Sequence, residues 1–449
     1  MEKNAIAKHS FLKPVVLAIG YVGGRPVTFW LNAAVVAVWL YLLWPLFDPV
    51  FFNPTYAIYL MLILTLPALG YIYLALIGGW RINTGLLIAF VCVFAVGEIY
   101  LRLRKPEHQW VVPHPHPYYM FTGIPNSSGQ LLPQQGGAND PDNIYRLNSL
   151  GFRIERPFIK SKPDGELRIF VLGGSTVFQG SPLAKTIPGQ IETELLRRGF
   201  SGATVYNFGI VSAVSGQELA LVTHLLVDYA PDVVISYGGG NDIYSPYQYD
   251  PRPGFPFNFV TLQFGTQALA RGLDLRTALA SQLFRSRVIS RIFAPRMEEI
   301  RLPLNALRGA TGYRTPQWEK AIIDAYSDNL YRMCRLGSAF NFRFYAVLQP
   351  MIFQKSPLTE TEMELKFGDA NFVSYMRRQH DQASNAFQRL QADNRLEGDC
   401  RFVDLSQIFA NDPRSLFSDF AHVTDDGNAT IASAIATDLA NSLLPQRTH

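Results

Sequence analysis

The sequence predicts an α/β protein in which helices cover both faces of a parallel sheet, preceded by an N-terminal bundle of three transmembrane helices. Two patterns support this prediction. Three apolar stretches, each about long enough to cross a bilayer as a helix, lie within residues 1–105. From residue 166 onward, short apolar runs alternate with stretches of helical spacing, which is typical of a parallel sheet with helical crossovers.

The composition limits the class of protein. A length of 449 residues fits two or three units at about 150 residues per domain. Because 48% of the residues are hydrophobic, a disordered chain is excluded. The charged fraction of 17% is below the roughly 25% typical of soluble domains. Three cysteines are too few for a disulfide scaffold, and a net charge of +4 is too weak to indicate a nucleic-acid partner.

The apolar stretches of residues 1–105 predict transmembrane helices at about 27–47, 56–78 and 85–103. The first two contain no ionisable residue, and the third carries Glu98 near its end. A segment in lipid must be helical because its backbone polar groups find no water there. Tryptophans near the proposed ends are typical of the membrane interface, and the bilayer is therefore an expected partner.

The distribution of Lys and Arg predicts the orientation of this membrane domain. Four basic residues precede the first stretch, namely Lys3, Lys8, Lys13 and Arg25, whereas the first loop has none. The tail is therefore expected inside and the C-terminal domain outside, in the periplasm or extracellular space, as part of a multi-pass protein of the inner (cytoplasmic) membrane. Three basic residues at or just after the end of the third stretch, Arg102, Arg104 and Lys105, oppose this orientation, and an even number of crossings would reverse it.

Residues 106–165 are rich in Pro, Gly, Asn and His and predict a connector with little regular structure. His114 and His116 are candidate metal ligands. However, alternating His and Pro without a nearby Cys or carboxylate is typical of a solvated linker. No metal site is expected.

The α/β domain is predicted over residues 166–445, with an insertion at about 243–317. Strands are expected at residues 167–174, 204–210, 232–237, 343–350 and 401–406, and helices at residues 187–198, 217–228, 318–336, 371–395 and 425–443. In a parallel sheet of this kind ligands bind beyond the carboxyl ends of the strands. The loops that follow the strands are therefore expected to carry the chemistry.

Three of these loops carry small or polar residues at the strand end. Ser175 follows the first strand within GGST, a pattern that exposes a hydroxyl at a helix start but also suits an ordinary N-cap or phosphate loop. Gly209 follows the second strand and either lets a backbone N–H approach a ligand or simply makes a turn. Asn241, in the GGND segment after the third strand, either directs its amide at a developing oxyanion or forms an Asn-Asp turn.

The fourth loop precedes the last helix and contains an acid and a histidine. Asp419 and His422 are three residues apart, so on a turn they can share one face. The carboxylate can then hold the imidazole in the tautomer that a general base needs. Asp425 and Asp426 fit a different role, since acids stabilise a helix N-terminus.

In their order along the chain these blocks resemble those of the SGNH (GDSL-type) hydrolase superfamily. The resemblance covers roughly residues 165–445, and Gly174 departs from it because the family has Asp before its serine. It implies a flavodoxin-like three-layer α/β/α domain and a catalytic triad of Ser175, Asp419 and His422. It also implies an oxyanion hole formed by the Ser175 N–H, the Gly209 N–H and the Asn241 amide, without a cofactor.

The chemistry implied is formation of an acyl-serine intermediate. If water resolves it, the protein is an esterase; if a sugar hydroxyl resolves it, the protein is an O-acyltransferase. The leading hypothesis is a membrane-anchored enzyme that removes or transfers acyl groups, acetyl first, on cell-envelope or exported polysaccharide, with polysaccharide export or synthesis proteins as partners. It rests on similarity to membrane-linked family members, which is a weak basis for a substrate. The alternatives are a lipid or lysophospholipid esterase and a non-catalytic glycan-binding scaffold in an export complex.

The insertion opens with residues 244–259, which are dense in Tyr, Phe and Pro and suit either sugar rings and acyl chains or a stiff surface loop. Arginines interleaved with apolar residues follow over 271–314, a pattern that favours lipid headgroups or acidic polysaccharide, or only a solvated helix face. Cys334 and Cys400 can pair in an oxidising compartment, but the sequence does not give their separation.

Overall fold

The computed structural model describes residues 92–103, 113–131, 144–271, 286–289, 291–292, 304–365, 368–393, 396 and 399–443. The stretches predicted to cross the membrane at 27–47 and 56–78, and the first part of 85–103, lie outside these residues. Within the described part, no helix has both the length and the apolar character that a membrane crossing requires. The chain divides into two compact units, residues 1–105 with 279–297 and residues 106–278 with 298–449, which are taken separately below.

In the first unit, residues 92–103 are helical and carry exposed apolar side chains such as Val93 and Leu103. The carboxylate of Glu98 accepts hydrogen bonds from the Ser286 hydroxyl at 2.9 Å and from the backbone N–H of Arg287 at 3.0 Å and of Val288 at 3.1 Å. Glu98 thereby caps the helical turn at 287–289, so part of the predicted insertion belongs to this unit. Four arginines of the basic stretch, Arg276, Arg285, Arg296 and Arg301, lie outside the described residues.

The second unit is built on a five-stranded parallel sheet, as the sequence predicts. Its strands are β5 (Leu167–Gly173), β6 (Ala203–Gly209), β7 (Val233–Gly238), β8 (Arg343–Leu348) and β9 (Cys400–Asp404), in the spatial order β6-β5-β7-β8-β9. This is the order of a flavodoxin-like sheet. Every residue of β7 is buried, which requires cover on both faces of the sheet.

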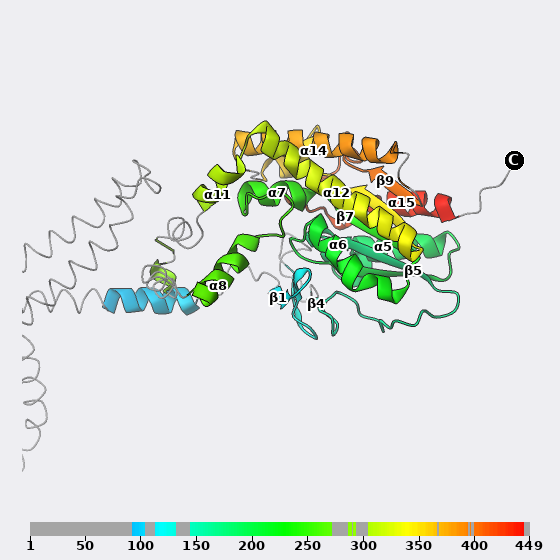
Figure 1. The fold of residues 1–449 in the computed structure, drawn as a ribbon, viewed down its shortest axis with the longest axis horizontal. Helices are drawn as coiled ribbons and strands as arrows, with labels where there is room; N and C mark the ends of the chain where they lie inside the picture. The colour runs from blue at the N-terminus through cyan, green and yellow to red at the C-terminus, as the bar shows by residue number, and fades with distance from the viewer. Residues whose placement is uncertain are drawn as a thin grey trace, which may run out of the picture. The chain divides into compact units, whose positions relative to one another are not determined.

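Two groups of helices provide this cover (Figure 1). In one group α5 (Ile187–Arg197) packs on α15 (Asp425–Leu443). In the other, α12 (Pro316–Phe340) packs on α6 (Ser215–His224) and on α14 (Ala370–Gln391). Helix α12 is longer than its predicted range because the Thr315 side chain caps its start and Asn341, in the left-handed conformation, ends it.

Further elements connect these helices and strands. They are α4 (Ser175–Phe178), η3 (Leu183–Lys185), η4 (Leu226–Tyr229), α7 (Gly240–Gln248), α8 (Phe259–Arg271), α11 (Leu304–Thr311), η5 (Ile352–Gln354) and α13 (Glu360–Met363). Two of them, α4 and α7, begin directly at the carboxyl ends of β5 and β7. The serine and asparagine blocks therefore reach the same edge of the sheet.

The connector has more regular structure than the sequence predicts. Strand β1 (Pro113–His116) pairs antiparallel with β2 (Met120–Gly123), and β3 (Ser128–Gln130) pairs antiparallel with β4 (Ile144–Arg146). The prediction of little regular structure is corrected because scattered apolar residues anchor this segment. Tyr119, Phe152 and Ile154 all belong to the main hydrophobic core. The His116 ring stacks on that of Tyr119 at a centroid distance of 3.5 Å.

A disulfide joins Cys334 of α12 to Cys400 of β9, with their Cα atoms 5.7 Å apart. The sequence left this pairing open, because the two cysteines are separated by 66 residues. The bond therefore links α12, which covers the sheet, to β9, the last strand in the spatial order.

Candidate active site

Ser175 lies at the turn between β5 and α4. The backbone can turn here because Gly173 has φ 155°, and a Cβ at this residue would lie only 2.4 Å from the carbonyl oxygen of Tyr237 on β7. Gly174 is the N-cap of α4, and Ser175 is the first residue of this helix. The close approach of two central strands therefore requires glycine at this point and presents the Ser175 hydroxyl beyond the sheet edge.

A continuous chain of hydrogen bonds joins the three residues of the predicted triad. The Nε2 atom of His422 lies 2.8 Å from Oγ of Ser175, and its Nδ1 atom lies 2.6 Å from Oδ2 of Asp419. The other carboxylate oxygen of Asp419 accepts the backbone N–H groups of Ala421 at 2.8 Å and of His422 at 2.7 Å. With Asp419 on Nδ1, the neutral imidazole has its proton there and leaves Nε2 free to accept the serine proton.

The charge of Asp419 is stabilised by these same contacts. Burial by itself raises the pKa of this carboxyl group. The hydrogen bond from the His422 ring, its charge when the ring is protonated, and the two backbone N–H groups outweigh burial and hold the pKa of Asp419 below the usual value. Asp419 is therefore ionised at neutral pH, as its role beside an imidazole requires.

A buried ion pair holds the loop that leads to Asp419. The Glu362 side chain is fully buried and pairs with Lys355, which is only 1% exposed. One carboxylate oxygen of Glu362 accepts the backbone N–H groups of Leu416 at 2.9 Å and of Phe417 at 3.1 Å. The Lys355 ammonium and these N–H groups keep the pKa of Glu362 low against the opposing effect of burial. The sequence does not reveal this role of Glu362, because the backbone groups that it holds lie 54 and 55 residues further along the chain.

The side chain of Gln179 holds the other end of the loop. Its Nε2 atom donates to the Val423 carbonyl oxygen at 3.0 Å, directly after His422. Because Gln179 follows α4, this bond links the serine turn to the histidine loop. Farther along, Lys185 and Asp425 form an ion pair at 2.7 Å. The distance between Ser175 and His422 is therefore set by contacts on both sides of the triad.

Asn241 lies beside the nucleophile, as predicted. Its Nδ2 atom donates one hydrogen to the Ala213 carbonyl oxygen at 2.8 Å, which orients the amide. A primary amide has two donor hydrogens, so the second can serve a ligand. A Cβ on Gly174 would lie 2.3 Å from this Nδ2 atom. Glycine at this residue therefore fits the position that Asn241 adopts here.

The structure does not support Gly209 as an oxyanion donor. Its N–H donates to the side-chain oxygen of Asn207 at 2.9 Å, and a Cβ at Gly209 would lie 2.6 Å from the backbone nitrogen of Phe178. Gly209 is therefore a packing glycine at the end of β6. The residue of this loop that lines the catalytic cavity is Ser212, whose backbone is left-handed with φ 65°. The position of Ser212 just past β6 could have marked it as a candidate, but the sequence does not show which N–H of the loop faces the cavity.

The catalytic cavity has a volume of about 140 Å³. It is lined by Ser175, Thr176, Ser212, Gly240, Asn241, Tyr244, Tyr249, Phe257, Gln349, Asp419, Phe420, Ala421 and His422. Three of these, Tyr244, Tyr249 and Phe257, come from the aromatic start of the predicted insertion. Gln349 follows β8 at the same sheet edge, so its position beyond a strand end could have identified it.

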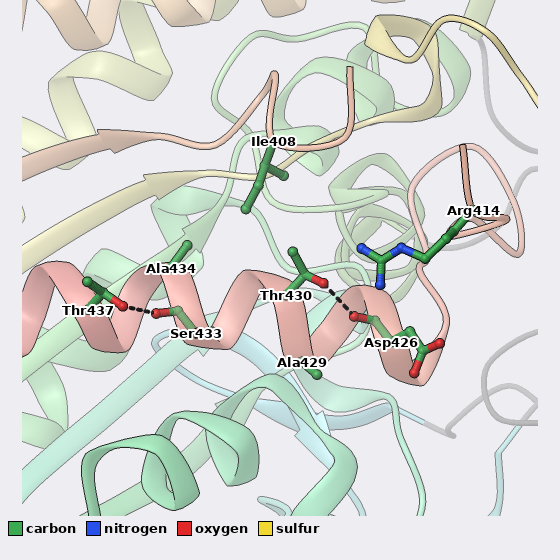
Figure 2. Close-up of a pocket in the computed structure, with 8 residues that line it drawn as sticks. All are labelled: Ile408, Arg414, Asp426, Ala429, Thr430, Ser433, Ala434 and Thr437. Carbon is green, nitrogen blue, oxygen red and sulfur yellow. Dashed lines mark hydrogen bonds between the residues drawn. The ribbon is translucent and has the colours of Figure 1, made fainter. Parts of the chain in front are cut away.

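A larger hollow of about 490 Å³ lies along α15 and contains no residue of the triad (Figure 2). Its lining consists of Ile408, Arg414, Asp426, Ala429, Thr430, Ser433, Ala434 and Thr437. The hydroxyls of Thr430 and Thr437 donate to carbonyl oxygens one turn earlier in their own helix. The geometry needed for acyl transfer is therefore found at Ser175 and not in this larger hollow.

No protein-family model matches the chain, and no curated protein sequence matches it. Solved structures of ester hydrolases do. The acetylxylan esterase Axe2 from Geobacillus stearothermophilus is 13% identical, covering 62% of this chain and 97% of that chain, with a TM-score of 0.35. A GDSL-like lipase from Bacteroides thetaiotaomicron is 14% identical, covering 63% and 92%, with a TM-score of 0.35. At such low identity, chemistry has to be read from the side chains of the site.

Proposed function

We propose that this protein is a serine ester hydrolase or O-acyltransferase of the SGNH type that works through an acyl group on Ser175. The observation that carries the proposal is the chain of hydrogen bonds from the Ser175 hydroxyl through His422 to Asp419. A serine hydroxyl is a weak nucleophile at neutral pH and needs such a base beside it.

The first half of the reaction forms the acyl-enzyme. The Ser175 oxygen attacks the ester carbonyl carbon while Nε2 of His422 takes the serine proton, and Asp419 stabilises the resulting imidazolium. The carbonyl oxygen becomes an oxyanion, for which we assign as donors the Ser175 N–H, the Asn241 amide and the Ser212 N–H in place of that of Gly209. When the tetrahedral intermediate collapses, the carbon–oxygen bond to the alcohol breaks and the alkoxide takes its proton from His422.

The second half releases the acyl group. A water molecule or a sugar hydroxyl attacks the acyl carbon, and His422 accepts its proton and returns it to the Ser175 oxygen as that bond breaks. Water gives a free acid and an esterase; a sugar gives a new ester and an O-acyltransferase. The site has the same requirements in both cases.

The size of the catalytic cavity supports a short acyl group. Its volume of about 140 Å³ is below the roughly 300–1,000 Å³ typical of sites for small organic ligands. A cavity of this size suits an acetyl group better than a fatty acyl chain. The cavity thus favours acetyl esters over the alternative of a lipid or lysophospholipid esterase. The complete triad counts against the non-catalytic scaffold.

We further propose that the enzyme is anchored in the inner membrane with its catalytic domain outside the cytoplasm. There it would act on cell-envelope or exported polysaccharide together with export or synthesis proteins. The apolar N-terminal sequence supports the anchor. The disulfide between Cys334 and Cys400 supports an oxidising compartment.

Hydrolysis of p-nitrophenyl acetate by the full-length protein in detergent tests this proposal. The wild-type protein should release p-nitrophenol, and Ser175→Ala should reduce the rate to the level of a buffer blank. A p-nitrophenyl ester of a long-chain acid should react far more slowly than the acetate. Equal rates for wild type and Ser175→Ala would contradict catalysis at this site, and a preference for the long-chain ester would contradict the short acyl group.

A further inference from the structure

A second cavity of about 410 Å³ adjoins the catalytic one. Its lining residues are Tyr244, Tyr247, Gln248, Arg314, Gly368, Asp369, Phe372 and Phe420. Two of them, Tyr244 and Phe420, also line the catalytic cavity. A volume in this range is typical of sites for small organic ligands, whereas the catalytic cavity lies below that range.

The shared wall connects the second cavity to the triad. Phe420 lies in the loop between Asp419 and His422, and its ring centroid is 5.1 Å from that of Tyr244. The Tyr244 ring in turn lies 5.7 Å from that of Tyr249 inside the catalytic cavity. A ligand whose ester carbonyl meets Ser175 can therefore extend past these rings into the second cavity.

Arg314 is held at the second cavity by aromatic contacts. Its guanidinium donates to the Tyr247 hydroxyl at 2.6 Å and lies 4.5 Å from the centroid of that ring. The backbone of Arg314 is left-handed, with φ 66°, just before the Thr315 cap of α12. A bulky residue keeps such a conformation only when its surroundings impose it, and these conformations cluster at functional sites.

Asp369 and Gln248 provide further polar groups. One carboxylate oxygen of Asp369 caps α14 by accepting the Phe372 N–H at 2.8 Å. Burial lowers the pKa of the Arg314 guanidinium, but Tyr313, Tyr247 and, to a smaller extent, the charge of Asp369 raise it above its usual value. The cavity thus combines aromatic rings with one positive and one negative side chain that balance each other.

We propose that this second cavity, the alcohol pocket, binds the alcohol part of the ester, and that this alcohol is an uncharged sugar ring. The inference rests on the proposed esterase or acyltransferase function. Aromatic rings suit the C–H faces of a pyranose, and Arg314, Asp369 and Gln248 suit its hydroxyl groups, which both donate and accept. An alkyl chain would bury these polar groups without giving them partners, which is costly.

Two variants test the alcohol pocket without altering the triad. Arg314→Ala removes a donor, and Asp369→Asn removes a charge while keeping a side chain that caps α14 equally well. The control is Lys320→Ala, which removes a positive charge that is 73% exposed on the same helix that Arg314 precedes. The substrates are methyl glucopyranosides and mannopyranosides with a single acetate, glycerol monoacetate, and methyl acetate, whose alcohol is too small to fill the alcohol pocket.

The expected result is a selective loss. For the best sugar acetate, kcat/KM should fall roughly 10- to 100-fold in Arg314→Ala and Asp369→Asn, the usual effect of losing a hydrogen bond to a charged group. The value for methyl acetate, which does not reach the alcohol pocket, should stay within about twofold in both variants, and Lys320→Ala should match wild type on every substrate.

Other outcomes would overturn the inference in distinguishable ways. Equal losses on sugar acetates and methyl acetate would show that the pocket only supports the triad. No loss on any sugar acetate, or a loss confined to glycerol monoacetate, would exclude a sugar as the alcohol and favour a glycerolipid. If wild type failed to cleave p-nitrophenyl acetate at all, the proposed function itself would fail.

Discussion

The nucleophile and the base of this site are held in place by different means. Ser175 is positioned by the sheet itself, since it follows β5 directly and Gly173 allows the backbone to turn against β7. His422 lies on an irregular loop that is fixed by long-range side-chain contacts, from Glu362 on one side and Gln179 on the other. Strand order determines the first position, and a few buried polar groups determine the second.

This difference shows where the site is vulnerable. A parallel sheet withstands most single substitutions because its hydrogen bonds are numerous and its core is large. A loop held by one buried ion pair depends on both members of that pair. The predictions below test each side of this contrast in turn.

The largest effect is expected from the base. His422→Ala leaves the Ser175 hydroxyl without an acceptor for its proton, so kcat for p-nitrophenyl acetate should fall by roughly 10⁵- to 10⁶-fold. Asp419→Asn should cost about 10⁴-fold because the imidazole loses the partner that fixes its tautomer. Circular dichroism should show an unchanged fold. Losses of about 10⁵ are expected when the base of such a triad is removed. If the kcat of His422→Ala stayed within tenfold of wild type, the triad would be ruled out.

The ion pair behind the loop should give the largest loss of stability. Glu362→Gln leaves the Lys355 ammonium buried without a counter-charge, and the free energy of unfolding should fall by about 3–5 kcal/mol. Denaturant unfolding measures this loss. The double variant Lys355→Met/Glu362→Gln removes the buried charge as well and should recover part of it. If Glu362→Gln unfolded at the wild-type denaturant concentration, the loop would not depend on this pair.

The position of the Asn241 amide should be sensitive to a single methyl group added at Gly174, the residue before Ser175. Gly174→Ala places a Cβ against the Asn241 amide, which must then move. The kcat should fall by up to about 10²- to 10³-fold, the loss seen when one oxyanion donor is removed. Asn241→Ala is the matched reference, and both variants should keep the wild-type KM. Full activity of Gly174→Ala would show that the amide position is not critical.

The smallest effect concerns pH. Because the folded-state pKa of Asp419 is below its value of about 3.9 in an unfolded chain, this carboxylate stabilises the fold fully above that value. The contribution should disappear as the pH falls through the lower folded-state pKa. The difference in unfolding free energy between wild type and Asp419→Asn should be smaller at about pH 2 than at about pH 7. A constant difference would contradict the lowered pKa.

The sequence predicts the sheet, its helices and three of the four blocks correctly in space because each follows from a local pattern. Ser175 and Asn241 lie just beyond strand ends, and Asp419 and His422 lie on the loop between β9 and α15, so a parallel sheet brings them to one edge. Gly209 also lies at the end of a strand, but its N–H donates to the side-chain oxygen of Asn207.

What the sequence could not predict depends on distant parts of the chain or on single backbone angles. The left-handed φ of Ser212 decides which residue of its loop lines the cavity. The contact of Glu362 with Leu416 spans 54 residues, and the anchoring of the connector through Tyr119 depends on the shape of a core formed elsewhere. None of these has a periodic or motif signature.

The most direct test of the central claim is covalent labelling with a fluorophosphonate, followed by peptide mapping. This reagent reacts only with a serine that a neighbouring base activates. We expect one labelled site, Ser175, with labelling lost in His422→Ala and kept in Lys320→Ala. Labelling of a different serine, or equal labelling of Ser175 in wild type and His422→Ala, would contradict it.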